Sequence, residues 1–332
     1  MEDMGAHGFE TAADGDAAPR TGVAWRDLRE WLELIERHGA LQRIGATVDT
    51  DEELSAITLL AASSTDAKAL LFENIKGDRL GARVLTNMLG ASAERYALAV
   101  GLDPRLTLRE MILATRDIMR RRIAPRMLDA HAAPVNEVVL RGADIDLTQF
   151  PAPKFWPGDG GRYIGTGDVT LTRDPVGGRI NVGVYRQMVH GPDRVGLYCS
   201  PGKHGRLDRE AWWAQGKSCE VVAAYGVDPV LFMVGAQTFS ATESELDVAG
   251  GIMGRPIDLV PAECVSLPLP AHAEVVIEGV LHAHDMELEG PLGEFTGYYG
   301  NVRAPQPPGA HRHHRCPAHR SCRDRPTRAR SA

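Results

Sequence analysis

Near its C-terminal end the chain reads Glu289-Gly290-Pro291-Leu292-Gly293-Glu294-Phe295-Thr296-Gly297-Tyr298-Tyr299-Gly300. Pro291 lacks a backbone N–H and the neighbouring glycines permit tight turns, so this segment is not a regular helix. The carboxylates of Glu289 and Glu294 stand five residues apart on it. Glycine-rich loops often hold carboxylates at a pocket edge for acid–base chemistry. Taken alone, the segment fits a surface turn with two solvated glutamates better, so the rest of the chain must decide.

The composition indicates a folded globular protein. The chain has 332 residues, 43% hydrophobic and 24% charged, enough for two domains with a substantial core. The formal net charge of −7 argues against nucleic acid as the main partner. There is no run of about 18 apolar residues, so we expect no membrane span. Residues 1–22 lack the basic start and apolar core of a signal peptide, and we expect a disordered leader.

Cysteine usage predicts a cytoplasmic protein. The five cysteines show no disulfide-framework spacing, which suits a reducing compartment. They are Cys199, Cys219, Cys264, Cys316 and Cys322.

Residues 23–130 alternate between helical and strand patterns, which is typical of a small α/β domain. The expected helices are Trp25–His38 (closed by Gly39), Glu52–Ala62, Glu94–Val100 and Leu108–Arg121, and the expected strands are Ala69–Phe72 and Arg83–Asn87.

From about Val135 the pattern changes to short β runs separated by Gly, Pro and Asp, which favours a β-barrel or sandwich. One run, Leu207–Gln215, is helical in pattern. The expected strands are Glu137–Leu140, Asp168–Thr172, Arg179–Tyr185, Glu220–Ala224, Val230–Met233 and Glu274–Val280.

Three polar elements lie in this β-rich part. Asn181 and Arg186 flank Gly183, and strand alternation places them on opposite faces unless the strand bends or ends between them. His204 stands in a Gly-flanked loop, where a lone His is more often solvent-exposed than a ligand. Glu245 precedes a turn of small residues. Each element by itself is weak evidence for a functional site.

Together and in this order, these elements resemble the UbiD-type decarboxylases, which use prenylated FMN. The resemblance covers about Trp25 to Pro307, and its specific parts are the Asn181-x4-Arg186 element and the Glu289-to-Gly297 element. It implies an α+β fold, with the α/β domain followed by a flavin-reductase-like split β-barrel over residues 131–307. Further matching stretches are Asp27-Leu28-Arg29-Glu30-Trp31-Leu32, Leu70-Leu71-Phe72-Glu73-Asn74, Pro151-Ala152-Pro153 and Asp159-Gly160-Gly161-Arg162-Tyr163.

The resemblance also implies a metal and cofactor site. Asn181, His204 and Glu245 correspond to the family's metal ligands, and with Arg186 they form the cofactor-binding set. In the family a divalent ion, usually Mn²⁺, joins the cofactor phosphate to the protein, with K⁺ nearby. Amide, carboxylate and imidazole donors suit such an ion. We choose Glu245 over Glu243 because it directly precedes the Leu-Asp-Val-Ala-Gly sequence.

Arg186, Glu289 and Glu294 correspond to the family's catalytic trio. Loss of CO₂ leaves a carbanion-like centre, for which the flavin-derived ring is the electron sink. Arg186 can clamp the substrate carboxylate, Glu294 can deliver a proton to the vacated carbon, and Glu289 can hold Arg186. Two carboxylates raise each other's pKa and a guanidinium lowers it, so the trio can store a proton near neutral pH.

The resemblance stops at Pro308. Residues 308–332 contain seven Arg, one Asp and no Leu, Ile, Val, Met, Phe, Tyr or Trp, so they cannot bury enough apolar surface to fold. We interpret them as a disordered basic tail arising from a frameshift near codon 308, in place of the family's C-terminal domain. We therefore expect the polypeptide as written to be poorly soluble and weakly active or inactive. The alternative is a metal-binding tail, whose candidate ligands are His311, His313, His314, Cys316, His319 and Cys322.

The leading functional hypothesis is a carboxy-lyase acting without net redox change on an aromatic or α,β-unsaturated carboxylic acid. Ubiquinone-precursor, phenolic and heteroaromatic acids stay open as substrates, as does the direction of the reaction. We expect a flavin prenyltransferase as cofactor supplier and a homo-oligomer for full-length relatives. The alternatives are an inactive relic that retains flavin or metal binding, and a flavin reductase, which shares only a fold class.

Overall fold

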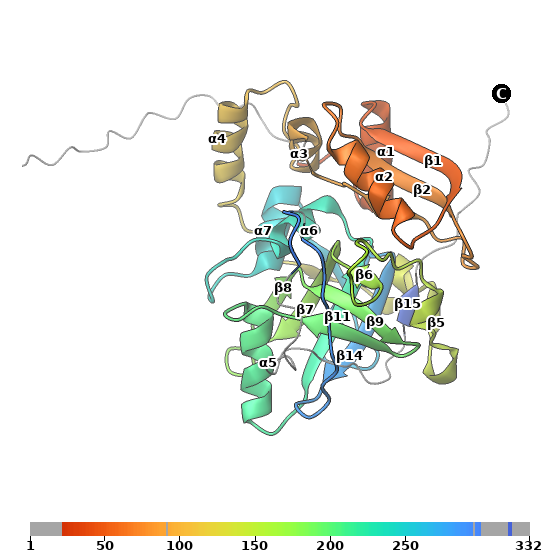
Figure 1. Cartoon of the computed structure of the whole chain (residues 1–332). Helices are drawn as coiled ribbons and strands as arrows, with labels where there is room; N and C mark the ends of the chain where they lie inside the picture. The colour runs from red at the N-terminus through yellow and green to blue at the C-terminus, as the bar shows by residue number, and fades with distance from the viewer. Residues whose placement is uncertain (1–21, 91, 295, 300–317, 321–332) are drawn as a thin grey trace, which may run out of the picture.

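The computed structural model describes residues 22–90, 92–294, 296–299 and 318–320. The predicted leader over residues 1–22 lies almost wholly outside this range, as does most of the predicted tail. Figure 1 shows two layers of structure, with the N-terminal helices and a small sheet above a larger group of strands. The predicted mixture of helices and strands is therefore confirmed.

The first part of the chain forms a three-stranded sheet with order β1-β2-β3, in which β1 and β2 are parallel and β3 is antiparallel to β2. Helix α1 begins where the Asp27 side chain accepts a hydrogen bond from the Glu30 amide. It ends before Gly39, whose positive φ of 71° suits glycine. The elements are α1 (Leu28–Arg37), β1 (Leu41–Val48), α2 (Glu53–Ala62), β2 (Ala69–Ile75), β3 (Val84–Thr86), α3 (Ala93–Ala99) and α4 (Leu108–Ile118).

The second part of the chain supplies most of the strands. They are β4 (Arg126–Met127), β5 (Val138–Leu140), β6 (Tyr163–Gly165), β7 (Asp168–Arg173), β8 (Ile180–Gly183), β9 (Arg186–Gly191), β10 (Arg194–Tyr198), β11 (Cys219–Tyr225), β12 (Asp258–Pro261), β13 (Pro268–Pro270), β14 (Val275–Leu281) and β15 (Ala318–Arg320). Three helices join them: α5 (His204–Ala214), α6 (Pro229–Gly235) and α7 (Glu245–Met253). Short 3₁₀ turns lie at Ala130–Ala132, Pro134–Asn136, Gly142–Asp144 and Leu147–Gln149.

These strands form three further sheets with orders β5-β15-β14-β11-β7-β8, β10-β9-β6 and β13-β12-β4. Strand β15, which lies within the predicted tail, pairs antiparallel with both β14 and β5. Within the described residues the strands close into no barrel, so the flavin-reductase-like split barrel stays a prediction.

Several sequence-based expectations about these elements are wrong. Val230–Met233 lies in helix α6, not in a strand, because Pro229 occupies the first turn and the Asp228 side chain accepts from the amides of Val230 and Leu231. The small-residue turn expected after Glu245 is helix α7, which begins where the Ser244 hydroxyl accepts from the Asp247 amide. Strand β1 was not anticipated.

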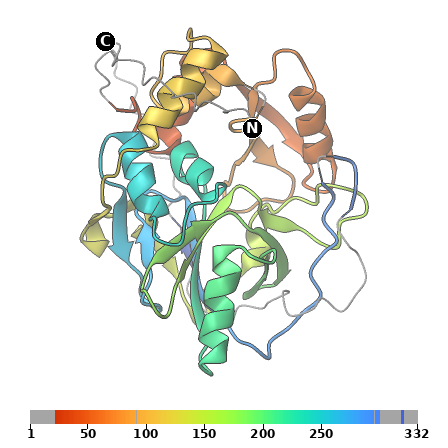
Figure 2. The ribbon, with the colours of Figure 1, turned by 90° about the vertical axis from the view of Figure 1, so that its left-hand side faces the viewer.

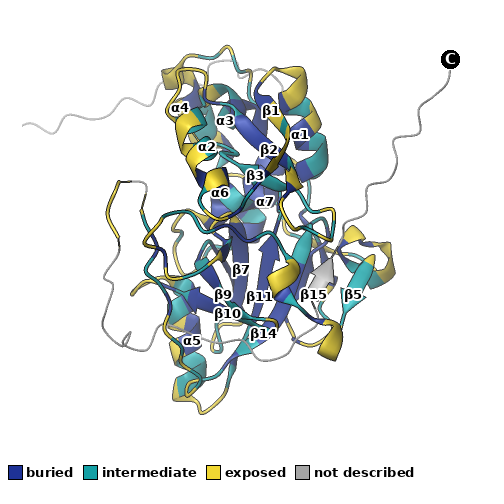
Figure 3. Ribbon diagram, turned by 45° about the vertical axis from the view of Figure 1, so that its right-hand side comes forward, coloured by how far each residue is buried: buried dark blue, intermediate teal, exposed yellow. Residues whose placement is uncertain are grey.

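One hydrophobic core joins both parts of the chain. It contains Trp25 and Trp31 from the N-terminal part, together with Val169 and Val222 from the large sheet and Ile252 from α7. Figure 3 shows β7, β11 and β14 largely buried, and Figure 2 shows α6 and α7 between the N-terminal elements and α5. The position of α7 therefore depends on both layers.

Candidate active site

Strand β8 ends at Gly183 and β9 begins at Arg186 in a different sheet. This break confirms that the strand ends between Asn181 and Arg186, and it frees the two side chains from strict alternation. A Cβ on Gly183 would overlap the ring of Tyr185, so a larger residue here would force that side chain to move.

Arg186 and Glu289 form a buried ion pair. Arg186 donates from Nη2 and Nε to Glu289 Oε2 at 2.7 and 3.2 Å, and the Glu289 side chain is fully buried. The guanidinium also lies 4.3 Å from the centre of the Tyr198 ring. Burial alone would lower the pKa of Arg186, but the hydrogen bonds and charge of Glu289 raise it overall, so the guanidinium stays charged.

Tyr163 holds the other side of the Glu289 carboxylate. Its hydroxyl lies 3.2 Å from Glu289 Oε1 and 3.2 Å from the Pro291 carbonyl oxygen, and it can donate to either. Burial, followed by the charge of Glu289, raises the pKa of Tyr163, so the hydroxyl stays protonated as a donor. Sequence reasoning quoted Tyr163 but gave it no role.

The loop that carries Glu289 is fixed by the segment before β6. Asp159 accepts from the Phe155 and Trp156 amides through Oδ2 and from the Gly293 amide through Oδ1, at 3.1, 2.9 and 2.7 Å. The Gly160 amide donates to Pro291 O at 2.8 Å. A Cβ on Gly160 would overlap the Gly290 carbonyl, so the two loops pack backbone to backbone.

Glu294 lies apart from this pair. It is exposed, and among the described residues no hydrogen bond or ion pair joins its side chain to Arg186 or Glu289. Its backbone is held by a hydrogen bond from the Glu294 amide to Tyr298 O at 2.8 Å. The structure thus brings two of the three predicted catalytic residues together.

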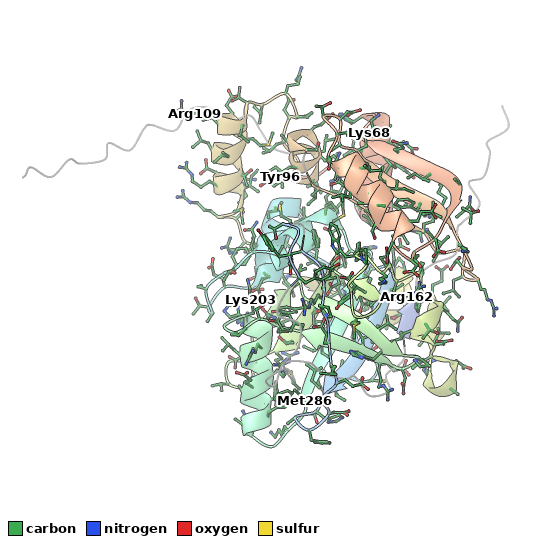
Figure 4. All side chains as sticks on the ribbon, in the orientation of Figure 1. Lys68, Tyr96, Arg109, Arg162, Lys203 and Met286 are labelled. Atoms are coloured by element: carbon green, nitrogen blue, oxygen red, sulfur yellow. The ribbon has the colours of Figure 1, made fainter. Side chains whose placement is uncertain are left out.

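Asn181, His204 and Glu245 come from three elements that meet near the N-terminal ends of α5 and α7. His204 is the first residue of α5, not a loop residue as expected, and its Nδ1 lies 3.9 Å from Glu245 Oε1. Figure 4 labels the preceding residue, Lys203, at the end of α5 nearest α7. Burial lowers the pKa of His204, and the charges of Arg179 and Lys203 lower it further, which favours the neutral imidazole that binds metals.

Tyr185 connects Asn181 to the start of α5. Its hydroxyl accepts from the Gly205 amide at 3.0 Å and from Asn181 Nδ2 at 3.4 Å. Asn181 Nδ2 also donates to Thr172 Oγ1 at 3.1 Å, across the β7–β8 pairing. Because the amide nitrogen is used in these bonds, the oxygen Oδ1 is the atom that Asn181 can offer to a cation.

Glu245 is almost fully buried, and its Oε2 accepts no hydrogen bond within the described residues. Burial raises the pKa of this carboxyl, against the opposing effects of its own backbone amide and of Arg179. A buried carboxylate oxygen without a hydrogen-bond partner suits an ion. No three His, Cys, Asp or Glu side chains of the described part gather closely enough to hold a metal, so a metal here would need Asn181 or a cofactor oxygen as well.

A cavity of about 530 Å³ lies between the N-terminal elements and the sheets, within the size range of ligand pockets. Tyr163 forms part of its wall. Apolar lining residues include Leu32, Leu85, Phe155, Phe232 and Val275.

A family model described as the 3-octaprenyl-4-hydroxybenzoate carboxy-lyase Rift-related domain (UbiD) matches residues 126–309. The model of the N-terminal domain of the same carboxy-lyase matches residues 32–115. The chain therefore belongs to the UbiD family of carboxy-lyases, as its sequence motifs indicate.

Solved UbiD-class structures share its fold. HmfF from Pelotomaculum thermopropionicum, in complex with FMN, is 30% identical with a TM-score of 0.79, over 89% of this chain and 63% of that one. Vanillic acid decarboxylase from Sedimentibacter hydroxybenzoicus in its closed form is 28% identical with a TM-score of 0.83, over 90% and 62%. The apo 3,4-dihydroxybenzoic acid decarboxylase (AroY) from Klebsiella pneumoniae is 26% identical with a TM-score of 0.75, over 89% and 62%.

The chain thus spans less than two thirds of the length of these relatives. An evolved dimeric form of HmfF carries prFMN. Every helix in the described part of the chain is too short or too polar to cross a membrane.

Proposed function

We propose that this chain is a non-oxidative (de)carboxylase of an aromatic or α,β-unsaturated carboxylic acid. Its own residues bind the substrate carboxylate and deliver the proton. The observation that carries the proposal is the buried Arg186–Glu289 ion pair with Tyr163 on its second oxygen. A guanidinium held at one edge by a fixed carboxylate keeps its remaining N–H groups for a second carboxylate. FMN and prFMN in relatives support prenylated FMN as the cofactor, and the chemistry it supplies is acceptance of the electron pair left by CO₂.

The residues divide the work as follows. Arg186 binds the substrate carboxylate and releases it as CO₂. Glu289 keeps the guanidinium in place, and Tyr163 keeps Glu289 in place. Glu294 delivers the proton to the vacated carbon in the decarboxylation direction, which requires its exposed side chain to turn towards Arg186 when substrate is bound.

Asn181, His204 and Glu245 would hold the divalent cation that binds together with the cofactor. Within the described residues Glu245 Oε2 accepts no hydrogen bond and the Asn181 amide hydrogen bonds leave its Oδ1 available, and the pKa of His204 is lowered by burial; these features support a Mn²⁺ site. The family resemblance adds K⁺ as a second ion. Residues 131–307 would form the cofactor-binding split barrel and residues 23–130 the α/β domain. The apolar cavity beside Tyr163 has room for the ring of a substrate or cofactor.

The proposal is tested by producing the chain together with a flavin prenyltransferase and supplying Mn²⁺. CO₂ release is then measured from vanillic, 3,4-dihydroxybenzoic and other aromatic acids. We expect release from at least one acid, and a rate lower by about 10²-fold or more in Arg186→Gln, because the substrate carboxylate loses its clamp. The control is Arg194→Gln, on the neighbouring strand β10. Bound flavin without CO₂ release from any acid would favour a binding module that cannot turn over.

A further inference from the structure

Arg179 precedes β8 and lies among the residues assigned to the cation, yet it is not one of them. Its Nη1 lies 3.5 Å from Glu245 Oε2, and its Nη2 lies 4.0 Å from Asp208 Oδ1. The arginine side chain is 14% exposed and that of Glu245 is 2% exposed. A positive charge is therefore enclosed beside the carboxylate that would bind the cation.

This pair is unlike a settled arginine–carboxylate contact. Arg29 and Glu274 form such a contact in the same molecule, with two parallel hydrogen bonds of 2.6 and 2.7 Å. By contrast, neither Arg179 Nη1 nor Glu245 Oε2 has a hydrogen-bond partner within the described residues. Arg179 therefore supplies Glu245 with a neutralising charge but leaves its oxygen open to another ligand.

Asp208 does not compete strongly for the guanidinium. The Thr172 hydroxyl donates to Asp208 Oδ2 at 2.6 Å, and burial raises the pKa of this carboxyl. Glu245 is thus the closer acid partner of Arg179, 3.5 Å away against 4.0 Å.

We propose that Arg179 is the counter-cation of Glu245 when the site holds no metal, and that it limits the affinity of the site for a divalent cation. This inference rests on the cation site assigned above. A metal bound at Glu245 takes over the neutralising role and is repelled by the guanidinium at short range. Arg179 accordingly stabilises the metal-free chain and weakens metal binding, two effects of opposite sign from one side chain.

The test measures Mn²⁺ binding by calorimetry and thermal unfolding with and without Mn²⁺ on the full chain. In Arg179→Gln we expect the Mn²⁺ Kd to fall about 10-fold, because the repulsion between the guanidinium and the divalent ion is removed. The midpoint of unfolding without metal should fall, because Glu245 loses its neutralising charge. Saturating Mn²⁺ should recover most of that loss. Arg179→Lys keeps the charge and should behave as the parent chain does.

Two controls separate this role from simple packing. Arg173→Gln removes an arginine on the same hairpin whose side chain donates to the carbonyl oxygens of Gly178 and Ser266, and it should leave the Mn²⁺ Kd unchanged. In Glu245→Gln, adding Arg179→Gln should no longer lower the metal-free unfolding midpoint.

Two outcomes of these measurements would overturn the proposed role of Arg179. Equal loss of stability with and without Mn²⁺ in Arg179→Gln, at unchanged Kd, would show a packing role and overturn the inference. If neither the parent chain nor Arg179→Gln binds Mn²⁺, both the cation site and the role of Arg179 are overturned. The CO₂ assay tests a separate claim. If the chain binds Mn²⁺ as described but releases no CO₂, only the proposed activity is contradicted.

Discussion

Arg186 donates both of its hydrogen bonds with Glu289 to one carboxylate oxygen, Oε2. The second oxygen is thereby left for the Tyr163 hydroxyl, and the remaining guanidinium edge is not used by Glu289. Hydrogen bonds hold the carboxylate from two sides, whereas within the described residues the Arg186 guanidinium donates hydrogen bonds only to Glu289. This asymmetry suits an arginine that must bind and release a second carboxylate.

Glu289→Gln should destabilise the fold by about 3 kcal/mol, because it leaves the buried Arg186 charge without its counter-charge. Urea unfolding measures the change. Glu210→Gln is the control, since Glu210 pairs with Arg206 on the surface of α5 at 2.7 Å, and its loss should cost about 0.5 kcal/mol or less. Equal effects in both variants would contradict a structural role for the buried pair.

Tyr163→Phe keeps the ring in the core and removes one hydrogen-bond donor. We expect a loss of about 1 kcal/mol in unfolding free energy, because Glu289 Oε1 loses the Tyr163 hydroxyl as a donor, whereas Pro291 O keeps the Gly160 amide. Tyr198→Phe serves as the comparison, because its ring can still stack on Arg186. If the two variants were equally stable, the Tyr163 hydroxyl would not hold Glu289.

Glu294→Gln separates stability from chemistry. The side chain is exposed, so the unfolding free energy should change by less than about 0.5 kcal/mol. Loss of the proposed proton donor should lower the rate of CO₂ release by about 10²–10⁴-fold. Full activity in this variant would mean that the proton comes from another group.

The stability of the chain should fall between about pH 4 and about pH 7 because of Asp168. This residue is fully buried, and burial raises its pKa to about 7 against hydrogen bonds from Thr170 and Gln187. Between these pH values the folded state therefore keeps a proton on Asp168 that the unfolded state loses. Above about pH 7 the contribution of Asp168 to the unfolding free energy no longer changes with pH.

Asp168→Asn removes this dependence. Its unfolding free energy relative to the parent chain should rise by about 3 kcal/mol from about pH 5 to about pH 7.5. Asp103→Asn is the control, because Arg105 holds the pKa of Asp103 at about 2, outside this window. Parallel pH profiles for Asp168→Asn and the parent chain would mean that Asp168 is ionised throughout.

Gly160→Ala should cost about 2 kcal/mol or more, because the new methyl group would overlap the Gly290 carbonyl. Gly167→Ala is the matched control, since a Cβ there meets nothing within 4 Å. Thermal unfolding of both variants measures the difference. A stable Gly160→Ala chain would show that the loop carrying Glu289 can shift.

The sequence could predict elements whose local signals agree with their tertiary setting. Helix α1 has a capping Asp27, an apolar stripe and a terminal Gly39, and it was placed correctly. Helix α6 was predicted as a strand, because its apolar run also suits a buried strand and the helix-start signal of Asp228-Pro229 was given too little weight.

The site could be predicted only where a family motif marked it. Arg186 and Glu289 are far apart in sequence, and their pairing follows from the fold. Tyr163 and Arg179 carried no motif of their own, because their roles arise from neighbours on other elements. The one available signal was position, since both lie inside stretches that were already singled out.

Helix α7 begins at Glu245 and ends at Met253, whose carbonyl oxygen accepts a hydrogen bond from the Val23 amide at 3.2 Å. The candidate cation site and the N-terminal segment thus contact opposite ends of one helix. Coupling between two such contacts is reciprocal. If docking of the segment at Val23 stabilises the position of α7 that binds a cation, cation binding must tighten that docking by the same free energy.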